Sequence, residues 1–211
     1  MKKEDIFFAI TGDIVSSKEI SDRDKIQKLL IQTCEEVNKL FTNYIIVNFS
    51  ITVGDEIQGL IKRNSPVFEI IEYFEKVLFP VKIRFGVGEG GISTSYYSTT
   101  TKMDGECFIN SRKGIEEGRK EKRLLKIIIK DKKTEQFLDI IILWIEKTKV
   151  EWDKIVFRRF YLYKELGSIE KVAQREKVTK QSIGKCLKRA KYDLILKSEM
   201  VLAKWISTEN G

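Results

Sequence analysis

The chain has no histidine, only two prolines and only three cysteines. Histidine is the side chain that most often transfers protons near neutral pH and is a common zinc ligand, so its absence argues against both kinds of site. Cys34, Cys107 and Cys186 lie far apart and form no C-x-x-C pair, which leaves no recognisable zinc pattern. Each lies among apolar or small residues, so we expect buried thiols; a catalytic thiolate would lack a histidine base.

Long apolar runs are also absent. The N-terminal run Ile6–Ile10 is short and is followed by charge, which fits neither a signal peptide nor a membrane span. Phe137–Ile145 is nearly continuous but too short to cross a bilayer. With 42% hydrophobic and 33% charged residues among 211, the chain suits a globular protein with one sizeable core and a small second module. We therefore expect a cytoplasmic protein.

Basic residues are concentrated in the second half of the chain. Residues 1–120 hold 17 Lys and Arg against 18 Asp and Glu, a net charge of −1, whereas residues 121–211 hold 22 against 13, a net charge of +9. A basic segment of this kind favours a polyanionic partner. A surface rich in lysine only for solubility is the alternative that charge alone leaves open.

The first 130 residues or so predict alternating strands and helices. Apolar residues at helical spacing predict helices over 21–41, from about 66 to 77, and over 106–119. Apolar runs predict strands over 6–11, 44–53, 57–61, 81–88 and 124–129, with Asp13 ending the first. Glycines in and after 81–88 indicate close backbone approach or a bulge. This order is typical of an α+β, ferredoxin-like sandwich.

Acidic residues follow two of the predicted strands. Asp13 follows the first apolar run, and Asp55 with Glu56 lies at a reversal led by Gly54, which predicts a hairpin tip. Carboxylates at neighbouring strand ends can hold a hard cation such as Mg²⁺, with water and substrate phosphates as further ligands. One hypothesis is a metal-assisted nucleotide site. The alternative is an ordinary turn, since Asp and Gly favour turns for backbone reasons alone.

Four motifs in this half occur in the order found in one protein family. They are Gly12-Asp13-Ile14, Val53–Ile57 (V-G-D-E-I), Arg84–Gly90 (R-F-G-V-G-E-G), and Asp104-Gly105 followed by Asn110 and Arg112. Through them the sequence resembles the SatD family, whose N-terminal domain is similar to class III nucleotidyl cyclases and GGDEF-type diguanylate cyclases. The resemblance covers roughly residues 5–130 and implies a cyclase-type sandwich.

The resemblance also implies roles for particular residues. Asp13 and Asp55 would hold Mg²⁺ or Mn²⁺, with Glu56 as a substitute at the hairpin tip. A purine nucleotide would meet residues on three segments: Ile14, Ser16 and Ser17 near the phosphates, Asp104 at the purine edge, and Asn110 and Arg112 at the ribose and the developing phosphate charge. In an active enzyme, a ribose hydroxyl would attack the α-phosphate at a site formed across a homodimer. The alternative is a degenerate cyclase fold that serves as a nucleotide sensor or a dimerisation scaffold.

A nearly continuous apolar helix is predicted over Thr134–Lys149. Because it is hydrophobic around much of its circumference, we expect it to be buried, either between two domains or in a dimer interface. The expected domains are therefore 1–131, a cyclase-like α+β domain; 132–150, a connecting apolar helix; and 151–211, an all-α helix-turn-helix domain.

Three helices are predicted in this last domain, over Asp153–Leu166, from Ser168 to about Lys177, and from Thr179 to about Leu196. Five residues fall where a helix-turn-helix places its core: Val172, Ala173, Val178, Ile183 and Leu187. The stretch Val178–Lys191 resembles the helix-turn-helix of sigma-factor region four and of LuxR-type domains.

This second resemblance implies contacts with double-stranded DNA. Four side chains would face base edges: Lys180, Gln181, Ser182 and Lys185. Lys188 and Arg189 would lie nearer phosphates. A helix-turn-helix can also bind protein, and a purely structural helical bundle is a further alternative.

Together these features predict a DNA-binding regulator whose cyclase-like domain forms a homodimer and binds a nucleotide with a divalent metal. The competing prediction is an active nucleotidyl cyclase or polymerase that makes a second messenger, with the helix-turn-helix as its targeting or control element.

Overall fold

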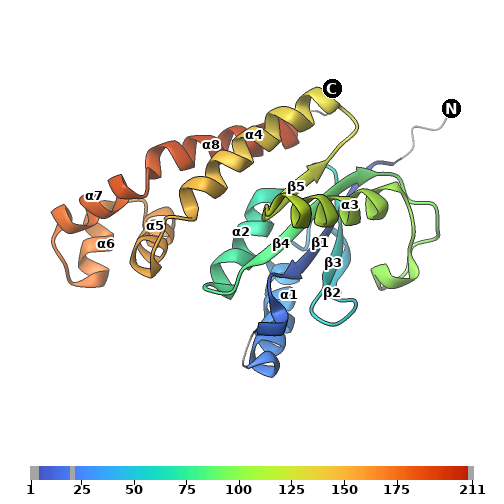
Figure 1. The fold of residues 1–211 in the computed structure, drawn as a ribbon, viewed down its shortest axis with the longest axis horizontal. Coiled ribbons are helices and arrows are strands. Elements are labelled where there is room, and N and C mark those ends of the chain that lie inside the picture. The colour runs from blue at the N-terminus through green and yellow to red at the C-terminus, as the bar shows by residue number, and fades with distance from the viewer. Residues whose placement is uncertain (1–4, 20–21, 209–211) are drawn as a thin grey trace. The chain divides into compact units, whose positions relative to one another are not determined.

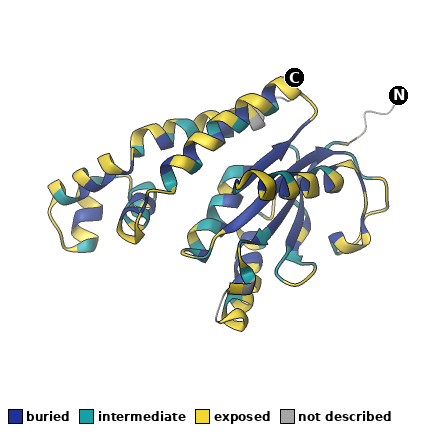
Figure 2. Cartoon of the chain, in the orientation of Figure 1, coloured by how far each residue is buried: buried dark blue, intermediate teal, exposed yellow. Residues whose placement is uncertain are grey.

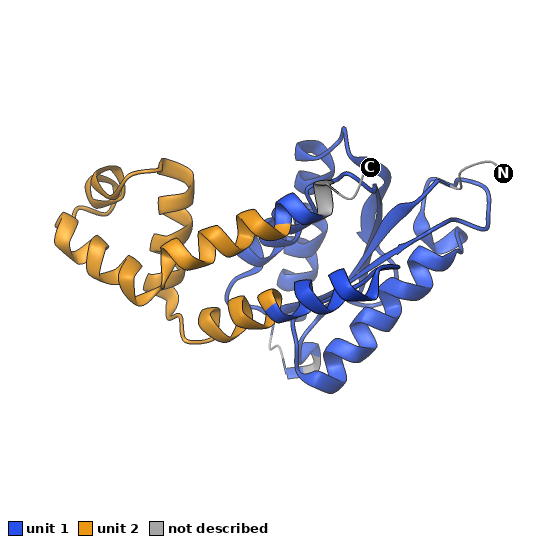
Figure 3. Cartoon of the chain, turned by 90° about the horizontal axis from the view of Figure 1, so that it is seen from above, with its two compact units in different colours: residues 1–140, 203–211 blue, residues 141–202 orange. Residues whose placement is uncertain are grey.

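The computed structural model describes residues 5–19 and 22–208. The chain divides into two compact units, one of residues 1–140 with 203–211 and one of residues 141–202 (Figure 3). The division falls inside helix α4 (Lys132–Lys149), and the last helix, α8 (Tyr192–Thr208), likewise contributes to both units.

A single mixed sheet forms the centre of the first unit (Figure 1). Its strands are β1 (Phe7–Ile14), β2 (Ile45–Ile51), β3 (Ile57–Lys62), β4 (Ile83–Gly90) and β5 (Leu125–Ile128). They lie in the order β2-β3-β1-β4-β5, with β5 parallel to β4 and the other neighbours antiparallel. The first four strands thus have the ferredoxin-like order, which confirms the predicted α+β sandwich.

Three helices of this unit pack on the sheet: α1 (Arg23–Leu40), α2 (Val67–Leu78) and α3 (Glu106–Glu121). On one face, Phe74 of α2 contacts Phe49 and Phe85. Side chains alternate along a strand, so Gly86, next to Phe85 in β4, faces α3 on the other side of the sheet. A Cβ added at Gly86 would collide with backbone atoms of Ser111 and Ile115. The glycines of this strand therefore allow the close backbone approach that the sequence predicts, and β4 is buried on both faces (Figure 2).

The first strand is longer than its apolar run predicts. Asp13 does not end it, because β1 continues to Ile14 with Asp13 paired to Arg84 and Ile14 to Ile83 of β4. Backbone pairing with β4 thus extends β1 beyond Asp13, although aspartate by itself disfavours strands.

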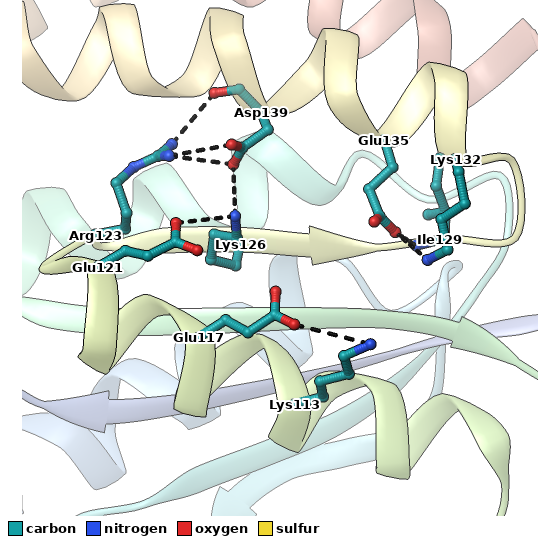
Figure 4. A network of polar contacts seen from close by, with 9 residues as sticks. All are labelled: Lys113, Glu117, Glu121, Arg123, Lys126, Ile129, Lys132, Glu135 and Asp139. Carbon is teal, nitrogen blue, oxygen red and sulfur yellow. Dashed lines mark hydrogen bonds and ion pairs between the residues drawn. The ribbon is translucent and has the colours of Figure 1, made fainter.

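Helix α4 differs from its prediction in burial. Leu138, Ile142 and Ile145 are buried, but Ile140 is 68% exposed and Trp144 is 40% exposed. The buried apolar residues form one stripe within this chain, so burial of Ile140 and Trp144 would need a second copy, and the dimer interface stays a prediction. The first part of α4 is held to β5 by an ion-pair network in which Asp139 contacts both Arg123 and Lys126 (Figure 4).

The second unit contains α5 (Lys154–Leu166), α6 (Ile169–Glu176) and α7 (Lys180–Arg189) with parts of α4 and α8. Its three helix starts are capped by side chains, those of Asp153, Ser168 and Thr179. The single helix predicted from Thr179 to Leu196 is wrong, because the chain breaks between α7 and α8, where Lys191 has a φ of 51°.

Candidate functional site

Asp13 lies at the end of β1 between two arginines. Its Oδ1 accepts a hydrogen bond from Arg84 Nη1 at 3.3 Å, and its Oδ2 accepts one from Arg119 Nη2 of α3 at 2.7 Å. The Asp13 and Arg84 side chains are only 16% and 10% exposed, whereas Arg119 is 65% exposed. The hydrogen bond and the charge of Asp13 raise the pKa of Arg119, with a smaller contribution from Glu56. Asp13 is therefore a carboxylate whose charge is balanced within the chain.

The hairpin between β2 and β3 has the predicted glycine-led tip, with Gly54 at a φ of 61°. Glu56 Oε1 accepts a hydrogen bond from Thr52 Oγ1 at 2.9 Å, which holds this carboxylate against its own hairpin. The pairing of Gly12 with Ile57 brings the end of β1 to the start of β3, so Asp13 of β1 lies near the hairpin residue Glu56, which directly precedes β3.

These residues, as they are arranged, do not fit a divalent metal. Both oxygens of Asp13 are taken by guanidinium groups, whose positive charge opposes a nearby cation. Among residues 5–19 and 22–208, no group of three or more acidic or cysteine side chains could hold a metal ion. A metal site shared by Asp13, Asp55 and Glu56 thus remains a prediction, which the arrangement of these carboxylates does not support.

A cavity of about 390 Å³ opens beside α3 in the same unit. Eight residues line it: Gln58, Thr101, Lys102, Met103, Asp104, Phe108, Ile109 and Arg112. Two of the residues predicted to meet a nucleotide, Asp104 and Arg112, are thus brought to one cavity. Its lining combines apolar side chains with two cations and one carboxylate, a combination suited to a flat, anionic ligand.

Gln58 is a part of this cavity that the sequence analysis does not identify. It is 2% exposed and donates from Nε2 to Thr11 Oγ1 at 3.0 Å, while Thr11 in turn contacts Ser111 Oγ at 2.9 Å. The signal in the sequence is a glutamine within the apolar run Ile57–Ile61, because a buried polar side chain needs partners.

The other predicted nucleotide-binding residues do not line this cavity. Asn110 donates from Nδ2 to the backbone oxygen of Glu89 at 2.8 Å, so it points away from Arg112. Ile14 is buried in β1, Ser16 lies in the turn that follows with a φ of 55°, and Ser17 begins the short 3-10 helix Ser17–Glu19. Within one chain, Asp104 and Arg112 thus share a cavity that the other four residues do not line, and a site formed across a homodimer stays a prediction.

In the second unit, α6 and α7 form the predicted helix-turn-helix. Val172, Ala173, Ile183 and Leu187 make a buried cluster, and Lys177 takes the left-handed conformation in the turn, with a φ of 55°. Lysine thus fills the position that usually carries glycine. Val178 is the exception to the predicted core, because it is 36% exposed.

The polar residues predicted to face DNA fall into two groups. Lys180 forms an ion pair with Glu170 at 3.0 Å, Arg189 forms one with Asp153 at 2.7 Å, and the half-buried Ser182 accepts a hydrogen bond from Arg159. In contrast, Gln181, Lys185 and Lys188 are exposed, and in the described part of the chain none of the three has a side-chain hydrogen bond or ion pair.

Comparison with protein families gives a match that covers nearly the whole chain. The model of the SatD family matches residues 7–206. The chain belongs to the SatD family. The match includes both units, so this SatD protein shares with its family the helical part as well as the sheet. A comparison with curated proteins finds no match.

Solved structures similar to this SatD protein include nucleotidyl cyclases. A bacterial light-regulated adenylyl cyclase is 10% identical, with a TM-score of 0.44, over 59% of this chain and 76% of the other. The adenylyl cyclase CyaB from P. aeruginosa is 17% identical, with a TM-score of 0.37, over 52% and 71%. A regulator of polyketide synthase expression from Bifidobacterium adolescentis is 14% identical, with a TM-score of 0.24, over 97% and 86%.

Within the ranges that the structure describes, no helix combines the length and the apolar composition that crossing a bilayer requires.

Proposed function

We propose that this SatD-family protein is a DNA-binding regulator that contacts double-stranded DNA through α7. The observation that carries the proposal is the exposed face of α7, where Gln181, Lys185 and Lys188 share one side of a capped helix. Positions i, i+4 and i+7 lie on one face, so the three side chains can enter a groove together.

The charge of the second unit supports a polyanion as the partner. α7 contains four basic residues and no acidic one. Lysines and arginines around a recognition helix neutralise phosphates, which supplies most of the salt-dependent part of DNA affinity. An exposed glutamine on the same face adds a side chain that can pair with a base edge.

In this proposal the first unit joins two copies of the chain. Exposed apolar side chains of the first unit support a contact surface, namely Tyr96, Tyr97 and Ile109, which are 58%, 47% and 62% exposed. A homodimer would pair two recognition helices with two half-sites. Light scattering on the full chain should give a dimer, and Ile109→Glu should shift it towards the monomer.

DNA binding is tested by anisotropy with a labelled duplex of about 30 base pairs, roughly three turns. The full chain should bind at low salt, and the double variant Lys185→Gln/Lys188→Gln should bind at least tenfold more weakly. The matched control is the double variant Lys120→Gln/Lys197→Gln, because both lysines are exposed, one in α3 and one in α8, and their loss removes the same two charges. Equal loss in the control would mean that only total charge matters, and this would contradict recognition by α7.

A second candidate function is nucleotide binding in the cavity beside α3. This function is favoured because Lys102, Asp104 and Arg112 all line the same cavity of about 390 Å³. Arg112 would pair with phosphate oxygens, and Asp104 would accept hydrogen bonds from a purine edge. Mg²⁺ or Mn²⁺ would enter this function as the partner of the bound phosphates, since the acidic residues around Asp13 do not fit a metal.

Calorimetry with ATP and GTP, with and without Mg²⁺, tests this second function. Binding should be lost in Arg112→Gln and kept in Arg119→Gln, which removes an exposed arginine from the same helix. Chromatography of the same mixtures tests the competing enzyme. The product of an active cyclase or polymerase would be a cyclic nucleotide or a dinucleotide. If such a product forms and disappears in Asp13→Asn, the protein is an enzyme and not a nucleotide sensor.

A further inference from the structure

A half-buried glycine, Gly184, borders the exposed face of α7. Gly184 lies three residues after Gln181, one before Lys185 and four before Lys188, while Ile183 and Leu187 on the other side are buried. Residues three and four apart are neighbours on a helix surface. Gly184 is therefore a surface neighbour of Gln181 and Lys188, two of the side chains that the proposed function assigns to DNA, and Lys185 follows it directly in the chain.

Nothing in the described chain requires a glycine at this position. The backbone of Gly184 is not in the left-handed region, unlike that of Gly167, whose φ is 68°. A Cβ added at Gly184 would meet no atom within 4 Å. Glycine inside a helix is less stable than alanine. The helix thus carries a destabilising residue where its own backbone and packing would accept a side chain.

We propose that Gly184 is the point of closest approach between α7 and double-stranded DNA, and that Gln181 and Lys185 beside it read base edges. This inference rests on the proposed function. A helix without a Cβ at its contact point can lie deeper in the major groove, which brings the flanking side chains within reach of the bases. Glutamine can pair with adenine through two hydrogen bonds, and lysine can donate to the O6 and N7 of guanine.

Charge complementarity favours DNA over a protein as the occupant of this face. Lys185 and Lys188 flank the glycine, and Lys180 and Arg189 extend the positive charge to both ends of α7, which has no acidic residue. A polyanion can engage Lys185 and Lys188 directly and can compete with Glu170 and Asp153 for Lys180 and Arg189, whereas a typical protein surface mixes both signs of charge.

The experiment uses the full chain and a duplex selected from a random library by the wild-type protein. Gly184→Ala should raise the melting temperature by about 2 °C, because alanine favours the helix. The same variant should bind the duplex at least tenfold more weakly, and Gly184→Leu should bind more weakly still. Lys197→Ala, on the exposed side of α8, should keep the wild-type affinity within about twofold.

The outcomes separate this inference from the proposed function. A Gly184→Ala protein that is more stable and binds as well as the wild type overturns the role of Gly184 but leaves DNA binding intact. A less stable Gly184→Ala protein also overturns it, because the glycine would then serve the fold. If the wild type selects no duplex but binds poly-glutamate, the partner is an acidic protein, and both proposals fail.

Discussion

The guanidinium of Arg119 lies 2.7 Å from the carboxylate of Asp13, at the end of the first strand. Arg84 approaches the same carboxylate at 3.3 Å from the neighbouring strand. Two arginine side chains therefore occupy the position at Asp13 where the resemblance to cyclases implies a metal ion. The predicted metal site would therefore have to displace two arginines of the chain itself.

Replacing Asp13 should lower the free energy of unfolding more than replacing Arg119. Asp13→Asn leaves the largely buried Arg84 without its counter-charge, so we expect a loss of about 3 kcal/mol in the free energy of unfolding. Arg119→Gln should cost less than about 1 kcal/mol, because water screens an exposed pair. Urea unfolding of the two variants measures the difference, and similar losses would contradict the burial that the structure assigns to Arg84.

Millimolar Mg²⁺ should leave the melting temperature of the nucleotide-free protein unchanged. A ligand that binds the folded state raises the melting temperature by mass action, and the balanced charge at Asp13 offers a cation no such gain. Scanning calorimetry with and without Mg²⁺ measures this. A rise of several degrees that disappears in Asp13→Asn would restore the metal site that the sequence predicts.

The close contact between β4 and α3 predicts the effect of one methyl group. In Gly86→Ala the new Cβ would collide with Ser111 O and would lie 2.6 Å from Ile115 N, both backbone atoms that cannot rotate away. We expect a loss of about 3 kcal/mol or an insoluble protein. Gly91→Ala is the control, because the nearest atom to its Cβ is Asp5 O at 4.0 Å, and it should behave as the wild type.

The ion pair between Glu170 and Lys180 predicts a dependence on pH. The hydrogen bond from Lys180 lowers the pKa of Glu170 to about 2, followed by one from Ser168. Because the folded-state pKa lies below the unfolded value, the ionised carboxylate stabilises the fold above about pH 4.3, and this contribution is lost as the pH falls towards 2. NMR titration should show the low pKa, and Lys180→Ala should raise it; no change would contradict the pair.

The same pair predicts an effect on DNA binding. Glu170→Gln releases Lys180 and removes a negative charge beside α7, so affinity for a duplex should rise several-fold at low salt. The plot of log affinity against log salt should become steeper by about one unit, as for one more phosphate contact. Unchanged affinity and slope would place Lys180 outside the interface.

Much of the first unit could be predicted from the sequence. Apolar spacing predicts α3 over Glu106–Arg119, and the helix extends to Glu121. The Gly54 reversal predicts the β2–β3 hairpin, and the glycines of β4 predict the contact with α3. These features are local, because each depends on residues close together in the chain: the spacing of apolar residues, a glycine in a turn, or glycines without a Cβ in a strand.

The features that could not be predicted depend on distant partners. Asp13 looks like a strand end and a free carboxylate until Arg84 and Arg119 are placed beside it, which are 71 and 106 residues away. Ile140 and Trp144 look like core residues until the packing of α4 leaves them exposed. The break at Lys191 has no glycine or proline to mark it. Gln58 becomes part of a cavity only when β3 and α3 come together.

The most direct test of the account is a lysine footprint of the full chain with and without a DNA duplex. Acetylation followed by mass spectrometry reports how exposed each lysine is. The account predicts that DNA protects Lys185 and Lys188 of α7, while Lys28 of α1 and Lys197 of α8, both exposed, react as before. Protection confined to lysines of the first unit, such as Lys102 beside the cavity, would contradict DNA recognition by α7.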